Sequence, residues 1–373
     1  MNPFSFGTIV RGDFFYDRKE EGKRIVNTLT NGNNMVLFAP RRYGKTSLVF
    51  RVIEQLEEKG YTCVYFDFLP VYSIESFVNL YINAIEKKQN NLHRLVQIIT
   101  NVVKNIRPKL TFDSGGNPEF GIDLTEDTVS VQTLSEVLDL PEKLAQPGKK
   151  TIVIFDEFQE ITKLSKFNFE SLLRSKIQQQ QSVNYLFLGS RTHLLSDMFN
   201  NKNRAFYNSA SHLQLGTLPH EDTIAYLQTK FGLSGIIIEH SIARHLIEQS
   251  GNIPYYIQLL AAEIWQYMIT SQTQVTTGII ETCAKQIVEL KQDYYYELFD
   301  RQSVMQKQLL IALVQSSNNI FSSLYTKRFR LSAASTTQKS VMVLMDSGII
   351  DKTDSSYFIS DPFFKRFLQN YAS

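Results

Sequence analysis

The sequence has few cysteines, little net charge and no long apolar run. Cys63 and Cys283 are the only cysteines in 373 residues, and neither has a neighbour at metal-ligand or redox spacing. This scarcity argues against disulfides and against zinc. The formal net charge of +2 gives no general reason to expect nucleic acid or an acidic partner.

Signals for membranes and for export are also missing. The most apolar stretch, YYIQLLAAEIWQYMI, is interrupted by Gln258, Glu263 and Gln266, which makes it too polar to span a bilayer. The opening MNPFSFGTIVRGDFF lacks the basic start and apolar core of a signal peptide. These absences predict a cytoplasmic protein with no membrane partner, and the chain length predicts two or three domains.

Residues 35–56 combine a buried strand, a polar turn and a helix. Met35–Ala39 has the short apolar run of a strand buried on both faces, and apolar residues from Leu48 to Leu56 recur at helical spacing. The turn between them matches G-x-x-x-x-G-K-[ST], except that Ala39 replaces the first glycine. Alanine can occupy this position if its φ is negative, so the pattern still predicts a phosphate site at a helix N-terminus.

Three residues of this turn have roles that follow from the motif. Gly44 lets the backbone wrap around a phosphate, and Lys45 can reach the β and γ oxygens. The hydroxyl of Thr46 can bind Mg²⁺. The alternative interpretation is a basic, solvated turn between a strand and a helix.

A second buried-strand run, Thr151–Phe155, ends in Asp156 and Glu157. An aspartate at such a strand end can hold Mg²⁺, usually through water, and the adjacent glutamate can polarise a water for attack on a γ-phosphate. The alternative is that the two acids cap the next helix. Together, the two motifs predict nucleotide hydrolysis far better than either motif alone.

A third run, Tyr185–Gly189, is followed by Ser190 and Arg191. If this strand lies between the first two, Ser190 projects beside the γ-phosphate and can hydrogen-bond the attacking water. Arg191 is either an electrostatic partner or a surface residue, because one arginine at a strand end carries little information.

The order of these segments predicts an α/β fold in the first part of the chain. Residues 1–217 contain two more strand-like runs, Thr62–Phe68 and His212–Gly216, and helical stretches separate the five runs. This alternation is typical of a parallel sheet with right-handed crossovers. A turn with the sequence DSGGNP, flanked by alternating apolar residues, predicts an inserted hairpin near residues 108–126.

Two further regions follow. Residues 218–292 are mainly helical, and Pro254 is expected in the first turn of a helix. Residues 293–373 have the helix, strand, turn, strand pattern of a winged helix-turn-helix, whose second helix often enters a DNA groove. The residues that this second helix is expected to expose for reading DNA are Thr336, Thr337, Gln338 and Lys339.

The charged residues of this module give opposite indications about DNA binding. Lys327, Arg328 and Arg330 precede the second helix and can touch a DNA backbone, or form a solvated basic patch. Asp351 and Asp354 lie in the wing, where acids would oppose phosphate contact. DNA is therefore a weakly supported partner.

The chain resembles the archaeal-type ATPase family along essentially its whole length. The matching segments, in order, are FGTIVRGDFFYDRKEE, APRRYGKTSL, IVIFDEFQE, LFLGSR, SGNIPYYIQLL and SGIIDKTDSSYFISDPFF. This family is a branch of AAA-like P-loop ATPases, close to the signal-transducing STAND class and more distantly similar to origin-recognition initiators. The resemblance implies a parallel-sheet P-loop core, a helical lid, a C-terminal winged helix, and ATP with Mg²⁺ as cofactors.

The resemblance also implies roles for individual residues. Lys45 and Glu157 would be catalytic with Ser190 as the γ-phosphate sensor, and Thr46 and Asp156 would hold the metal. Phe15 and Arg18 would lie near the adenine, since FFYDRKEE matches a stretch with that position in related ATPases. The residues expected to surround the triphosphate are Pro40, Arg41, Arg42, Tyr43, Gly44, Lys45, Thr46 and Ser47.

Two departures from the family pattern concern arginines. The lid stretch GNIP lacks the arginine that AAA relatives direct at the γ-phosphate. Asn208 and Ser209 stand where many members have an arginine after a Tyr-Gly pair, and Arg204 comes a few residues earlier. Because arginine fingers can raise rates by orders of magnitude, we expect slow hydrolysis or a finger supplied by a partner.

We expect the protein to be an ATP-dependent conformational switch, in which ATP and Mg²⁺ close the domains together and hydrolysis releases them. One alternative is a DNA-binding ATPase that uses the winged helix, and another is a scaffold with hardly any turnover. The joint presence of Lys45, Thr46, Asp156 and Glu157 argues against the scaffold. A protein partner and a homo-oligomer both stay open.

Overall fold

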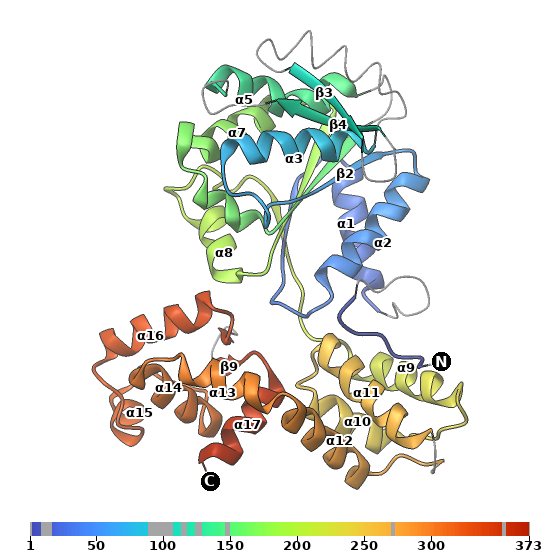
Figure 1. Ribbon diagram of the computed structural model, residues 1–373, viewed down its shortest axis with the longest axis vertical. Helices are drawn as coiled ribbons and strands as arrows, with labels where there is room; N and C mark the ends of the chain where they lie inside the picture. Colours follow the sequence, from blue (N-terminus) through green and yellow to red (C-terminus); the bar gives the residue numbers. More distant parts are fainter. Residues whose placement is uncertain are drawn as a thin grey trace. The chain divides into compact units, whose positions relative to one another are not determined.

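The computed structural model describes residues 2–8, 17–88, 107–112, 118–123, 129–145, 150–269, 273–352 and 356–372. The chain divides into two compact units (Figure 1). The α/β unit comprises residues 19–40 and 48–215, and the helical unit comprises residues 1–18, 41–47 and 216–373. Within the described ranges, no helix has both the length and the apolar character needed to cross a membrane.

Five parallel strands form the sheet of the α/β unit, which confirms the predicted fold class. The strand order is β2-β5-β6-β1-β7. The three central strands are buried along their whole length, as their uninterrupted apolar runs predict. The strands are β1 (Met35–Phe38), β2 (Thr62–Asp67), β5 (Thr151–Asp156), β6 (Val183–Gly189) and β7 (Ser211–Gln214).

Helices cover both faces of this sheet (Figure 1). One face packs against α1 (Lys19–Thr30) and α2 (Lys45–Glu58). The other face packs against α3 (Ile74–Glu86), α5 (Val131–Leu138), α6 (Leu140–Leu144), α7 (Phe169–Gln179) and α8 (Thr192–Asn200). Two short 3₁₀ helices, η2 (Phe158–Lys163) and η3 (Lys166–Asn168), connect β5 to α7.

The second of these faces has an aromatic core. Ring centroids of Phe155 and Phe158 lie 5.9 Å apart, and those of Phe158 and Phe187 lie 4.7 Å apart. Aromatic pairs at these separations add to the free energy of burying their area. This packing holds the start of η2 against β6, and thereby positions the polar residues that follow β5.

The predicted hairpin is present beside this core. β3 (Arg107–Phe112) pairs antiparallel with β4 (Pro118–Asp123). The turn residues 113–117 lie outside the described residues.

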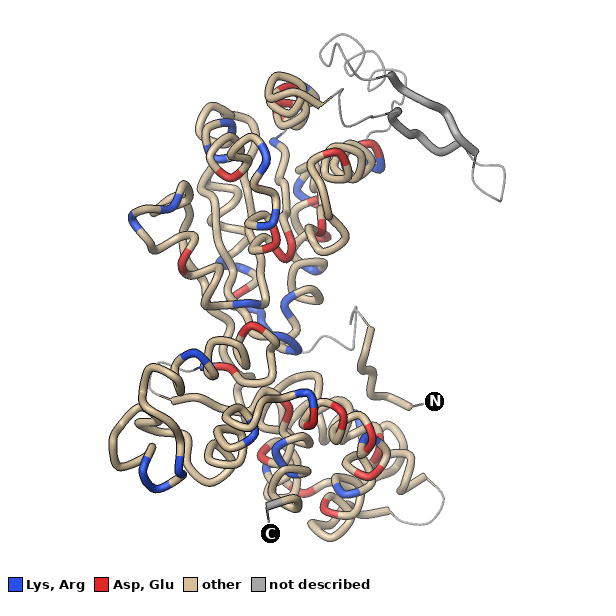
Figure 2. The backbone as a smooth tube through the Cα atoms, turned by 60° about the vertical axis from the view of Figure 1, so that its left-hand side comes forward, with Lys and Arg blue, Asp and Glu red and all other residues tan. Residues whose placement is uncertain are grey.

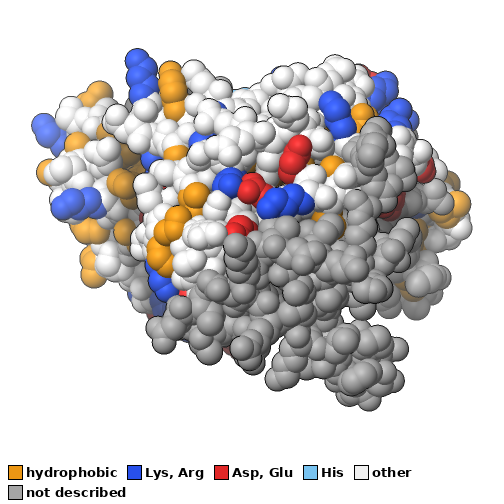
Figure 3. Space-filling model, turned by 90° about the horizontal axis from the view of Figure 1, so that it is seen from above, with side chains coloured by type: hydrophobic (Ala, Val, Ile, Leu, Met, Phe, Trp, Pro, Cys, Tyr) orange, Lys and Arg blue, Asp and Glu red, His pale blue; other side chains and the backbone are white. Residues whose placement is uncertain are grey.

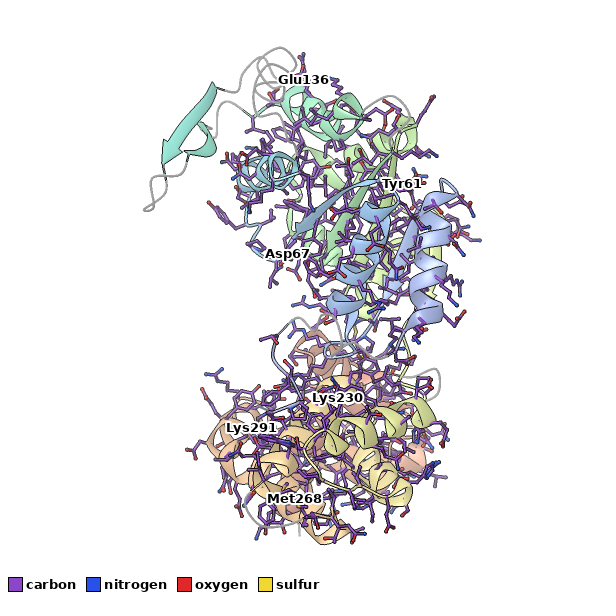
Figure 4. The ribbon with its side chains drawn as sticks, turned by 90° about the vertical axis from the view of Figure 1, so that its right-hand side faces the viewer. Tyr61, Asp67, Glu136, Lys230, Met268 and Lys291 are labelled. Atoms are coloured by element: carbon purple, nitrogen blue, oxygen red, sulfur yellow. The ribbon has the colours of Figure 1, made fainter. Side chains whose placement is uncertain are left out.

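Five helices begin the long segment of the helical unit. They are α9 (His220–Gly232), α10 (His240–Gln249), α11 (Pro254–Met268), α12 (Thr277–Leu290) and α13 (Gln292–Asp300). Pro254 occupies the first turn of α11 as predicted, where a missing N–H costs nothing. Figure 4 marks Lys230 in α9, Met268 at the end of α11 and Lys291 directly after α12.

A winged helix follows in the same unit, as predicted. Its elements are α14 (Val304–Gln315), α15 (Ser323–Arg328), α16 (Ala334–Asp346), the antiparallel strands β8 (Ile350–Lys352) and β9 (Tyr357–Ile359), and α17 (Pro362–Ala372). Residues 353–355 of the wing, and with them Asp354, lie outside the described residues.

One residue predicted to read DNA is not exposed. Thr337 is 1% exposed, and its hydroxyl donates a hydrogen bond to the carbonyl of Ser332. The prediction was wrong because Thr337 lies on the same helical face as Val341 and Leu344, which are buried. Thr336, Gln338 and Lys339 are exposed as predicted.

Charges of both signs are distributed over the described surface. Lys and Arg alternate with Asp and Glu along both units (Figure 2). Seen from above, basic and acidic side chains lie beside each other on one face (Figure 3). This mixing agrees with the small formal net charge of +2.

Candidate active site

The carboxyl ends of β1, β5 and β6 lie at one edge of the sheet. β6 lies between β1 and β5, as the role expected of Ser190 requires, and Phe38 pairs with Gly189. Ser190 directly follows β6 and Glu157 directly follows β5. Both therefore lie at the edge from which the loop after β1 starts. Figure 4 marks this edge with Asp67, the last residue of β2.

The loop after β1 contains two residues with positive φ. Gly44 has φ +79° and Arg42 has φ +74°, a region that glycine adopts readily and most other residues rarely adopt. Ala39 is not among the described residues with positive φ, so alanine is compatible with the place of the first glycine. A Cβ added to Gly44 would meet nothing within 4 Å, so backbone conformation rather than crowding requires this glycine.

Arg42 contacts two helices of the helical unit. Its carbonyl oxygen accepts a hydrogen bond from the backbone N–H of Tyr255 at 3.3 Å. Its guanidinium carbon lies 5.0 Å from the ring centroid of Tyr255 and 4.9 Å from that of Tyr256. Its Nη1 lies 3.1 Å from Oδ2 of Asp361, whose Oδ1 caps the start of α17. The side chain expected at the triphosphate is thus paired with the residue that caps α17.

The remaining loop residues differ in exposure. Arg41 is exposed, Thr46 and Ser47 are half-buried, and Lys45 is 7% exposed as the first residue of α2. Burial, and next to it the charge of Asp351, raises the pKa of Tyr43 to about 12. Tyr43 therefore stays a neutral phenol, which does not repel a phosphate.

Asp156 is a buried carboxylate with both oxygens hydrogen-bonded. It is 4% exposed, its Oδ2 accepts from the hydroxyl of Tyr65 at 2.7 Å, and its Oδ1 accepts from the backbone N–H of Glu157 at 2.8 Å. Burial and the charge of Asp156 raise the pKa of Tyr65, which keeps its hydroxyl protonated. The carboxylate is therefore held in one orientation at the sheet edge.

Glu157 and Ser190, two predicted site residues, are in direct contact. Oε2 of Glu157 accepts a hydrogen bond from Oγ of Ser190 at 2.8 Å and from its backbone N–H at 3.3 Å. Glu157 has a left-handed backbone, with φ 48° and ψ 41°, and its side chain does not cap η2. The helix-capping alternative is therefore wrong for this acid.

Gln159 also contacts Glu157, and no sequence motif assigned it a role. It is 2% exposed, and its Nε2 donates to Oε2 of Glu157 at 2.5 Å. A Cβ added to Gly189 would lie 2.2 Å from Oε1 of Gln159. The position of Gln159 in DEFQE, next to a buried strand end, was the signal in the sequence that could have indicated it.

Two arginines near this edge are paired with acids of the α/β unit. Nη2 of Arg204 lies 2.7 Å from Oε2 of Glu170, and its Nη1 lies 3.4 Å from Asp197. Nη1 of Arg191 lies 3.8 Å from Oε1 of Glu160. Arg204, the arginine that comes early in the family pattern, thus has a structural partner in this chain.

Of the two residues expected near adenine, the structure describes one. Arg18 is buried with φ 71°, and its Nη2 donates to the carbonyl oxygen of Gly216 at 2.5 Å. Phe15 lies outside the described residues.

The site residues present are compatible with Mg²⁺. Across the described part of the chain, no three His, Cys, Asp or Glu side chains form a group that could hold a metal. Mg²⁺ bound by one carboxylate, phosphate oxygens and waters needs no such group. Asp156, the last residue of β5, is a carboxylate of this kind.

Two family matches decide the class of protein. Residues 15–199 match the ATPase domain predominantly from Archaea, and residues 293–370 match a probable winged helix domain. Residues 15–199 are therefore a domain of the archaeal-type ATPase family. The archaeal-type ATPase combines the parallel-sheet core of P-loop ATPases with a C-terminal winged helix, as the resemblance implied.

The chain is similar to a curated relative in sequence and to two solved structures in fold. An uncharacterized ATP-binding protein of Pyrococcus horikoshii is 24% identical over 255 residues, which cover 65% of this chain and 73% of the relative. A Walker-type ATPase of Pyrococcus abyssi has a TM-score of 0.66 at 17% identity, covering 98% of this chain and 99% of the other. The ORC2 protein of Aeropyrum pernix has a TM-score of 0.56 at 13% identity, covering 100% and 97%.

Proposed function

We propose that this archaeal-type ATPase is a conformational switch, in which the nucleotide in the loop after β1 controls the helical unit. The observation that carries the proposal is the contact of Arg42 with Asp361. Arg42 belongs to the loop expected around the triphosphate, and Asp361 caps α17 of the winged helix. A change in the loop therefore acts on α11 and α17 through one side chain.

The proposed ATP site draws on three strand ends. Chain connectivity keeps the loop near β1, because Pro40 and Leu48, on either side of it, belong to the α/β unit. Lys45 would neutralise phosphate oxygens, and Thr46 with Asp156 would hold Mg²⁺. Residues 40–47 would surround the triphosphate, while residues 15 and 18 would face the base.

Turnover at this site would depend on Glu157 and Ser190. Glu157 would orient the attacking water, and Ser190 would donate to the γ-phosphate. Bound Mg²⁺ supplies charge neutralisation. Arg204 is paired with Glu170 and Asp197, which supports slow hydrolysis in the absence of a finger from a partner.

The charge of the nucleotide gives the switch a physical basis. A triphosphate and Asp361 are both anionic, so they compete for the guanidinium of Arg42. A ligand shifts a conformational equilibrium only by its difference in affinity for the two states. ATP would favour the state in which Arg42 faces the phosphates, and hydrolysis would restore its contact with Asp361.

Amide hydrogen exchange at the starts of α11 and α17 tests this proposal. We expect the exchange of Tyr255 and Phe363 amides to differ between ADP and a non-hydrolysable ATP analogue in the wild type. Arg42→Gln and Asp361→Asn should abolish this difference because each removes one charge of the pair. Arg301→Gln is the matched control, since Arg301 pairs with Glu297 on the exposed surface.

The controls separate loss of coupling from loss of binding. Calorimetry should show that Asp361→Asn still binds both nucleotides. If exchange is the same with both nucleotides in the wild type, or if the difference persists in Arg42→Gln, the archaeal-type ATPase does not switch through this contact.

A second candidate function, DNA binding, is favoured by one feature of the winged helix. Lys327, Arg328 and Arg330 are exposed at the end of α15 and in the turn after it, and Lys339 is exposed on α16. Such cations can contact a phosphate backbone. Against it, the solvent face of α16 also presents Met342 and Val343, which are 57% and 52% exposed.

A further inference from the structure

Glu157 and Ser190 are hydrogen-bonded to each other in the structure, although their proposed roles require other partners. The Ser190 hydroxyl has one proton, and it donates this proton to Oε2 of Glu157. The same proton cannot be donated to a γ-phosphate at the same time. Turnover therefore requires the hydroxyl of Ser190 to leave Glu157, and the other donors to the carboxylate must then keep it in place.

The side chain of Gln159 lies where it can hold the Glu157 carboxylate in place. Its Nε2 donates to the same Oε2 of Glu157 at 2.5 Å, and Gln159 is 2% exposed. Glu157 has a left-handed backbone, a conformation that non-glycine residues keep only where their surroundings hold them. The amide is thus a second, independent restraint on a strained residue.

The other end of the Gln159 amide indicates that stability alone does not explain this residue. Its Oε1 is buried and has no hydrogen-bond partner among the described residues. An unsatisfied buried carbonyl lowers stability, and an apolar side chain of similar shape would avoid that penalty. Oε1 fits only because residue 189 is glycine, since a Cβ there would lie 2.2 Å from it.

We propose that Gln159 is a positioning residue, which holds the Glu157 carboxylate for water activation once the γ-phosphate has taken the hydroxyl of Ser190. This inference rests on the proposed role of Glu157. Donation from the amide fixes the direction of the carboxylate. Removal of the donor should therefore lower kcat and leave ATP binding unchanged.

Steady-state ATP hydrolysis of Gln159→Met tests the proposal. We expect kcat to fall on the order of tenfold or more, because misplacement of a general base removes much of its contribution. The KM for ATP should change little, and the Tm should stay equal or rise. A purely structural role predicts the reverse: a lower Tm and an unchanged kcat.

Gln180→Met is the matched control, because Gln180 lies in the same unit with both ends of its amide hydrogen-bonded, to Tyr185 and Leu138. It should lower the Tm and leave kcat unchanged. Gly189→Ala tests the same contact, since its methyl group would displace Gln159 without altering Glu157. It should lower kcat at an unchanged KM even if Gln159→Met does not fold.

Glu157→Gln separates failure of this inference from failure of the proposed function. Wild-type turnover in Glu157→Gln would remove Glu157 from the mechanism and the inference with it. If Glu157→Gln is inactive while Gln159→Met and Gly189→Ala keep the wild-type kcat, the role of Gln159 is overturned and that of Glu157 stands.

Discussion

Substitutions of single residues in the proposed site should affect ATP binding and ATP hydrolysis separately. Lys45→Ala should weaken ATP binding by on the order of 100-fold, because a hydrogen bond to a charged group contributes about 1.5–3 kcal/mol. Glu157→Gln should bind ATP as the wild type does and hydrolyse it far more slowly. Calorimetry with ATP and Mg²⁺ measures the first effect, and phosphate release measures the second.

Lys59→Ala controls for the loss of a lysine near α2, since Lys59 is exposed directly after that helix. It should leave both measurements unchanged. ATP affinity in Lys45→Ala equal to the wild type would remove the loop after β1 from nucleotide binding.

At the scale of elements, α15 and α16 decide between the two candidate functions. We expect ATP turnover to be indifferent to duplex DNA, because exposed Met342 and Val343 share the solvent face of α16 with its polar residues. Turnover measured with and without DNA, at low and high salt, tests this expectation. Stimulation by DNA would instead favour DNA binding.

A double variant of Lys327 and Arg330, near the turn between α15 and α16, tests whether DNA contacts this part of the winged helix. If DNA binds, log affinity should fall linearly with log salt, and Lys327→Ala combined with Arg330→Ala should reduce the slope by roughly 2, because each phosphate contact contributes about 0.9. A slope that does not change would place any DNA contact elsewhere on the chain.

At the scale of the whole molecule, the two cysteines report on the two units separately. Cys63 lies in β2 of the α/β unit and Cys283 in α12 of the helical unit, and both are fully buried. Burial raises the pKa of Cys63 to about 12 and that of Cys283 to about 11. Since the thiolate is the reactive form, neither should react in the native protein at about pH 8.

Maleimide labelling at increasing denaturant measures the reactivity of the two thiols. Mass spectrometry of the two cysteine peptides reads the labelling of each. Each cysteine should become reactive when its own unit unfolds, so two separate midpoints indicate two cooperative units. Rapid labelling of Cys63 in the native protein would contradict the burial of its thiol in β2.

The comparison of sequence and structure shows which features local patterns can predict. The strand, turn and helix around Gly44 and Lys45 were predictable because the motif is continuous in the sequence. Thr337 was misjudged because the phase of α16 is set by packing in the helical unit. Gln159 was overlooked because its role depends on Gly189, which is distant in the sequence.

The sequence by itself determined the parallel sheet, which follows from local periodicity, and its motif segments gave the resemblance to the archaeal-type ATPase family. Only the tertiary structure placed Ser190 against Glu157, and Arg42 against Asp361. The physical reason is range: a strand or turn depends on neighbouring residues, whereas a hydrogen bond between distant segments depends on how the whole unit packs.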